Sequence, residues 1–85
     1  MSDKLQAQIN RGNSAKALLE SETLRIALDE LREDTKRISF DSKSDALIRE
    51  NCWLMFQAIE QLEKKLATYV SNGNMAQAIV AEEPH

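Results

Sequence analysis

The strongest structural signal lies in residues 48–69, which read IRENCWLMFQAIEQLEKKLATY. Apolar or aromatic residues recur there at alternating steps of four and three, the spacing of one face of a long amphipathic helix. These residues are Ile48, Cys52, Met55, Ile59, Leu62, Leu66 and Tyr69. We expect them to form a seam along which this helix packs on a neighbouring helix, in the same chain or in a second chain.

The composition favours an all-α fold. The 85 residues include only two Gly and one Pro, and strong helix formers such as Ala, Leu, Glu, Lys and Gln dominate. A chain of this size forms one domain at most, and its core alone gives only marginal stability. The single cysteine, Cys52, allows no internal disulfide. The sequence therefore predicts a helical hairpin with a long C-terminal helix and short flanking helices, completed by oligomerisation.

Residues that cap or break helices divide the chain into segments. Residues 1–13 are predicted to be a flexible arm, with Gly12 as a breaker, and residues 14–81 a single helical domain. We expect helices over about 14–20, 22–37, 42–71 and 75–81, and a polar tail over 82–85. The first two helices could be continuous or broken near Ser21, and the pattern favours the break. Asn72-Gly73 is predicted to end the long helix.

Two local patterns predict how the hairpin closes. The segment before the long helix has its own apolar stripe, formed by Leu24, Ala27, Leu28 and Leu31, with charged residues opposite. At the turn, three residues offer an N-cap side chain for the long helix: Asp41, Ser42 and Ser44. Asp45 falls three residues after Ser42, which is a carboxylate variant of a capping box.

Five consecutive large residues, Cys52 to Phe56, wrap more than half of the circumference of the long helix. Cys52, Met55 and Phe56 can face the first hairpin helix, which leaves Trp53 and Leu54 pointing elsewhere. Either a terminal segment folds back over them or they contact a partner. We expect Trp53, Leu54 and Phe56 to reach a partner, because Trp is favoured at the centres of protein contacts.

No catalytic, cofactor-binding or metal-ligating constellation is recognisable, so we expect no enzyme activity, cofactor or metal. Cys52 and His85 are the only soft metal ligands and lie far apart in sequence, and Cys52 is expected to be a buried small hydrophobe. Carboxylates alternate with Lys and Arg, which is typical of solvated faces with pairs such as Glu60 with Lys64. Gly12 and Gly73 stand outside any phosphate-binding loop.

The net charge of −3 argues against a dedicated nucleic-acid binder. No apolar run approaches the length of a membrane span, and the N-terminus lacks a secretory signal. The lone cysteine favours a reducing compartment. We expect a cytosolic protein without membrane contact.

Three short motifs carry a resemblance: residues 11–20 (RGNSAKALLE), Trp53-Leu54, and residues 72–78 (NGNMAQA). In this order the chain resembles a family of small helical proteins encoded by tailed bacteriophages and prophages near head-assembly and DNA-packaging genes. It departs from that family in its linker at residues 42–44 and in Glu22, where the family has a proline. The resemblance implies an assembly context in the host cytoplasm or the virion, and no active-site residues.

Two functions follow as hypotheses. The first is a non-enzymatic structural or assembly protein that packs its helices against itself, as a homo-oligomer, or against a larger capsid, portal or packaging component. The second is a small phage regulator that binds nucleic acid or inhibits a host protein. Its basic edge would consist of Arg11, Lys16, Arg25, Arg32, Lys36 and Arg37. The first is favoured because acidic residues interrupt that edge.

Overall fold

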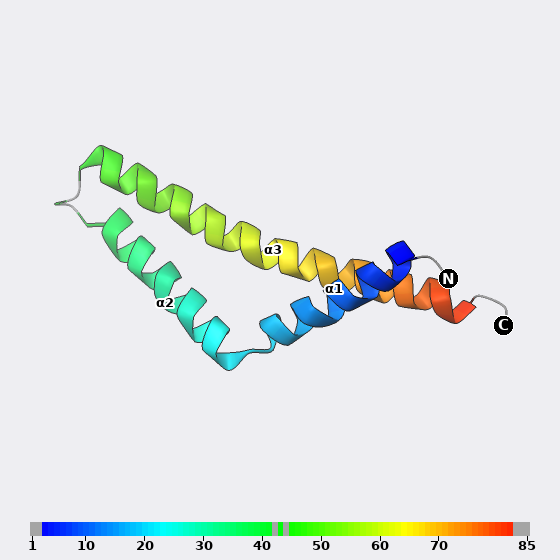
Figure 1. Ribbon diagram of the computed structural model, residues 1–85. Helices are drawn as coiled ribbons and strands as arrows, with labels where there is room; N and C mark the ends of the chain where they lie inside the picture. The colour runs from blue at the N-terminus through cyan, green and yellow to red at the C-terminus, as the bar shows by residue number, and fades with distance from the viewer. Residues whose placement is uncertain (1–2, 42, 44, 83–85) are drawn as a thin grey trace. The chain divides into compact units, whose positions relative to one another are not determined.

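The computed structural model describes residues 3–41, 43 and 45–82, and over these ranges the chain forms three α-helices and no strand. The helices are α1 (Asp3–Leu19), α2 (Glu22–Ser39) and α3 (Ala46–Glu82), shown in Figure 1. The predicted all-α fold with a long C-terminal helix is confirmed. The predicted break near Ser21 is present, because α1 ends two residues before this serine and α2 begins directly after it.

The helices form two compact units, where the sequence predicts one domain over residues 14–81. The terminal unit comprises Met1–Ser21 and Lys64–His85, so α1 packs there against the second half of α3. The hairpin unit comprises Glu22–Glu63, in which α2 packs against the first half of α3. Each unit has its own small core.

The N-terminal segment is helical from Asp3, so the prediction of a flexible arm over residues 1–13 is wrong. The reason is a face of α1 that packs on α3. Leu5, Gln8 and Ile9 are half-buried on this face, and Gly12 and Ala15 are buried. Such packing, rather than intrinsic propensity, supplies most of the stability of a short helix.

Gly12 and Gly73 mark the point where α1 crosses α3 within the terminal unit (Figure 1). A Cβ atom on Gly12 would lie 2.9 Å from both the Gly73 Cα and the Tyr69 carbonyl oxygen. A Cβ atom on Gly73 would lie 3.0 Å from the Gly12 Cα. Both glycines are therefore needed for close approach of two backbones. The predictions that Gly12 breaks a helix and that Asn72-Gly73 ends one are wrong.

The two ends of α3 also differ from the prediction. The helix runs through residues 72–73 to Glu82, so the separate helix expected over 75–81 is part of it, as is the first residue of the expected polar tail. At its start, the backbone N–H of Ile48 donates to Asp45 Oδ1 at 2.8 Å, which makes Asp45 the N-cap. The Asp41 carboxylate instead accepts from the Lys43 N–H in the turn, while Ser42 and Ser44 lie outside the described residues.

In the hairpin unit, α2 and the first half of α3 run antiparallel (Figure 1). The residues buried between them are few: Leu28 and Thr35 on α2, and Ile59 on α3. Leu31, predicted to belong to the stripe of α2, is 50% exposed, and Arg32 takes the position facing α3. The core of this unit is therefore narrow and partly polar.

Candidate interaction surface

The seven residues of the predicted seam on α3 occupy three environments. Ile59 and Leu66 are buried, and Cys52 and Tyr69 are half-buried. Ile48, Met55 and Leu62 are 45%, 54% and 47% exposed, so these three do not form the core of the hairpin unit. Phe56 and Glu63, each one residue further along, contact α2 instead.

Arg32 fixes which side of α3 faces α2. Its Nε donates to Glu60 Oε1 at 2.8 Å, its Nη2 donates to Glu63, and its Nη1 donates to Asp29 Oδ1 at 2.8 Å. The hydrogen bond with Glu63 is the largest cause of a raised pKa for Arg32, and burial opposes it. The guanidinium therefore stays charged at all ordinary pH values. Glu60 thus pairs with Arg32 across the hairpin. The sequence alone suggests Lys64, four residues further along the same helix, as its partner.

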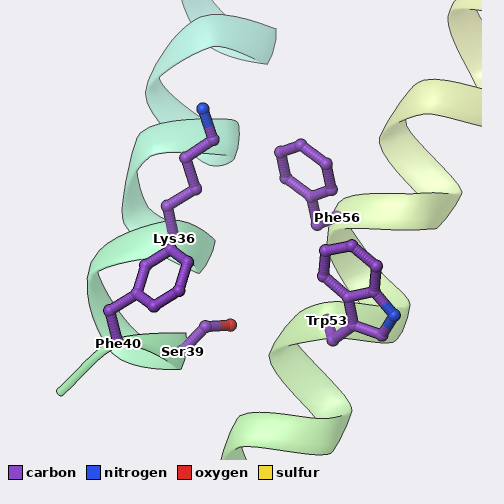
Figure 2. A pocket seen from close by; sticks show the side chains of 5 residues that line it. All are labelled: Lys36, Ser39, Phe40, Trp53 and Phe56. Atoms are coloured by element: carbon purple, nitrogen blue, oxygen red, sulfur yellow. The ribbon is translucent and has the colours of Figure 1, made fainter.

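An open aromatic pocket lies beside this cluster in the hairpin unit. It has a volume of about 70 Å³, is open to solvent, and is lined by Lys36, Ser39, Phe40, Trp53 and Phe56. Figure 2 shows the first three residues facing the two rings of α3 across the hairpin. The rings of Trp53 and Phe56 stack with centroids 5.7 Å apart, and the Lys36 ammonium lies 5.6 Å from the centroid of Phe56. At this distance the ammonium and the ring form a cation–π contact.

The residues predicted to face a partner are only partly brought together. Trp53 and Phe56 share the aromatic pocket, with Trp53 54% exposed and Phe56 half-buried. Leu54 is also 54% exposed, but it lies outside this pocket, about 100° round the helix from Trp53. The sequence analysis missed Phe40, which is 84% exposed at the end of α2. The position of Phe40 in the sequence could have indicated this, because an aromatic residue next to the hairpin turn lies level with the start of the following helix.

The basic residues that could line a nucleic-acid edge make contacts within their own units. Arg11 lies over the ring of Tyr69, with its guanidinium carbon 5.5 Å from the centroid, and Lys36 over that of Phe56. Arg37 pairs with Asp34, and Arg32 with three carboxylates. Four of the six side chains therefore already have an acidic or aromatic neighbour, which leaves less positive charge for phosphate contacts.

The described ranges contain neither a metal-binding cluster nor a helix that could span a membrane. No cluster of three or more His, Cys, Asp or Glu residues there could hold a metal ion. Cys52 is a half-buried free thiol, and His85 lies outside the described residues. Within residues 3–82, leaving out 42 and 44, no helix has the length and apolar character needed to cross a membrane.

The chain matches no protein-family model, no curated protein and no solved structure. A functional proposal therefore rests on the surface of the chain itself and on the sequence resemblance described above.

Proposed function

We propose that this protein is a non-enzymatic assembly protein that acts by packing its helices against another protein chain, either a second copy or a larger component. One observation carries the proposal. In the described part of the hairpin unit only two large apolar side chains, Leu28 and Ile59, are buried. Ten are exposed: Ile26, Leu31, Ile38, Phe40, Leu47, Ile48, Trp53, Leu54, Met55 and Leu62. Exposure on this scale marks an interaction surface.

The free energy available from covering these side chains is comparable to the stability of the fold. Since full burial of one large apolar side chain contributes about 1.5–3 kcal/mol, covering five half-exposed ones contributes on the order of 4–8 kcal/mol. Net stability of about 0.05–0.15 kcal/mol per residue gives a chain of this size roughly 4–13 kcal/mol. Association therefore stabilises the helices as much as their internal cores do.

The biological context in this proposal comes from sequence. The motifs at residues 11–20, 53–54 and 72–78 resemble small helical proteins of tailed phages, and such a protein would meet capsid, portal or packaging subunits. A large partner of this kind offers a helical surface on which a short helical hairpin can complete its core.

Sedimentation of the purified wild-type protein from low micromolar to several hundred micromolar tests the self-association part of the proposal. We expect the mass to rise above the 9.6 kDa of the monomer as the concentration increases. Far-UV circular dichroism on the same samples measures helicity. A monodisperse monomer that keeps its full helicity across this range would contradict self-association and leave only a different partner protein.

A further inference from the structure

The two edges of the hairpin unit differ in chemistry. Consecutive residues lie about 100° apart round the axis of a helix. When one residue lies on one side of the line of contact with the partner helix, the residue before it therefore lies on the other side. Leu31, Met55 and Leu62 directly precede Arg32, Phe56 and Glu63, and the latter three make the contacts between α2 and α3 on the edge that carries the Arg32 ion pairs and the aromatic pocket. The former three therefore gather on the opposite edge of the hairpin.

This opposite edge carries several exposed large apolar side chains. These residues, which we call the apolar strip, are Leu31, Ile38, Ile48, Met55 and Leu62, between 38% and 54% exposed. The contacts of Arg32 with Glu60 and Glu63, and of Lys36 with Phe56, set the antiparallel register. In that register Leu31 lies level with Leu62, and Ile38 level with Met55. Two layers of the strip, Leu31 with Leu62 and Ile38 with Met55, therefore have one large apolar side chain from each helix, and Ile48 extends the strip along α3 beyond the end of α2.

We propose that the apolar strip is the docking site of a second copy of this chain, which packs its own strip on it to form a four-helix bundle. This inference rests on the proposed function and specifies the face and the partner. A two-fold interface uses the same patch on both copies, so the patch must be self-complementary. Layers of similar aliphatic side chains without a charge among them meet this condition, whereas a partner selected by charge would require a charged strip.

The exposed area also agrees with the requirement of a stable dimer. Aromatic side chains bury roughly 150–250 Å² and large aliphatic ones somewhat less, so a half-exposed aliphatic side chain leaves on the order of 80 Å². Leu47 and Leu54, on the same side of α3, are 65% and 54% exposed. With the five strip residues they offer roughly 550 Å² of apolar surface per copy. A standard interface buries about 800 Å² per partner, of which a little over half is apolar.

Charge placed on the strip tests the proposal. In Leu31→Lys and, separately, Met55→Lys, an ammonium would have to be buried between two copies. The matched control is Ile26→Lys, because Ile26 is 47% exposed but lies about 200° round α2 from the buried Leu28. A second comparison is Trp53→Ala, which removes a ring from the aromatic pocket. Mass is measured by size-exclusion chromatography with light scattering over a concentration series, and helicity by circular dichroism.

We expect wild type, Ile26→Lys and Trp53→Ala to form dimers, and both strip variants to dissociate roughly 100-fold more readily with helicity retained in the monomer. Strip variants that dimerise as tightly as wild type would overturn the proposal. If the Trp53 variant alone loses association, the second chain sits on the aromatic pocket, so this proposal fails while the proposed function stands. If the wild-type protein stays monomeric at every concentration, both the docking of a second copy on the strip and the self-association in the proposed function are overturned.

Discussion

Gly12 and Gly73 show how a single pair of residues can replace a conventional core. Four of the buried residues where α1 meets α3 are small: Gly12 and Gly73, and Ala15 and Ala76, which are 2% and 1% exposed. Without Cβ atoms at the crossing, the two backbones approach closely enough for these alanines to be almost fully covered. The stability of this unit therefore depends on backbone proximity, since no large side chain other than Leu66 is buried among its described residues.

Substitution of Gly12 by alanine reverses the usual effect of this change in a helix. Alanine normally gains about 1 kcal/mol over glycine in a helix interior. Here the new Cβ would meet backbone atoms of α3 at 2.9 Å, so we expect Gly12→Ala to lower the free energy of unfolding by about 1–2 kcal/mol. The matched control is Asn13→Ala, an exposed position of the same helix, which should be neutral or slightly stabilising. Urea unfolding at one fixed protein concentration measures both, and a stabilised Gly12→Ala would contradict the close crossing.

At the scale of elements, the face that α3 presents to α2 is selected by charge as well as by hydrophobicity. Arg32 reaches across the hairpin to two carboxylates of α3, and its side chain is only 19% exposed. Its carboxylate partners, Glu60 and Glu63, lie on the side of α3 that also bears Phe56. These ion pairs align α2 with one edge of a broad apolar face and leave Met55 and Leu62 on the other edge.

Arg32→Met tests this role of the ion pairs. The variant keeps an unbranched side chain but leaves Glu60 and Glu63 without their cation, so we expect the free energy of unfolding to fall by about 1–2 kcal/mol. Arg37→Met is the matched control, because Arg37 is 77% exposed and its ion pair among the described residues is with Asp34 on its own helix. Its loss should stay below about 0.5 kcal/mol. Equal stability of the two variants would show that Arg32 does not hold α2 on this edge of α3.

The all-α fold and the long C-terminal helix could be predicted from the sequence. Which residues of each helix face its neighbour could be predicted only in part. Periodicity identifies the apolar face of α3, but that face is too broad for one neighbouring helix, so periodicity cannot tell which edge packs inside the chain. Leu62 and Glu63 illustrate this limit, because the apolar residue is exposed and the charged one contacts α2. Gly12 and Gly73 were misread for a related reason, since helix-breaking and close-packing glycines look alike without knowledge of the opposing helix.

The sequence does not predict the aromatic pocket, although two of the residues that line it, Trp53 and Phe56, were expected to reach a partner. Trp53 and Phe56 belong to a run of large residues that stands out in the sequence, and the structure places them together. Phe40 and Lys36 come from the other helix, and their proximity to the rings depends on the register of the hairpin. That register follows from the pairing of Arg32 with Glu60, a contact over 28 residues that local patterns do not reveal.

At the scale of the whole molecule, two small units each bury little apolar surface within themselves. The terminal unit relies on a glycine crossing, and the hairpin unit exposes far more large apolar side chains than it buries. A chain of this size with a single cysteine, and therefore no internal disulfide, gains stability readily from contact with other chains. The association that we propose would account both for the narrow core of the hairpin unit and for its apolar strip.

Methionine oxidation at increasing protein concentration measures coverage of the apolar strip directly. Met55 lies on the strip and is 54% exposed, whereas Met75, near the end of α3, is 65% exposed and serves as the internal control. Peptide mass spectrometry after a short peroxide pulse gives both rates, in samples whose mass is known from sedimentation. We expect the oxidation of Met55 to slow as the protein associates, while that of Met75 stays constant. A Met55 that is oxidised equally fast in monomeric and associated samples would contradict the docking of a second chain on this strip.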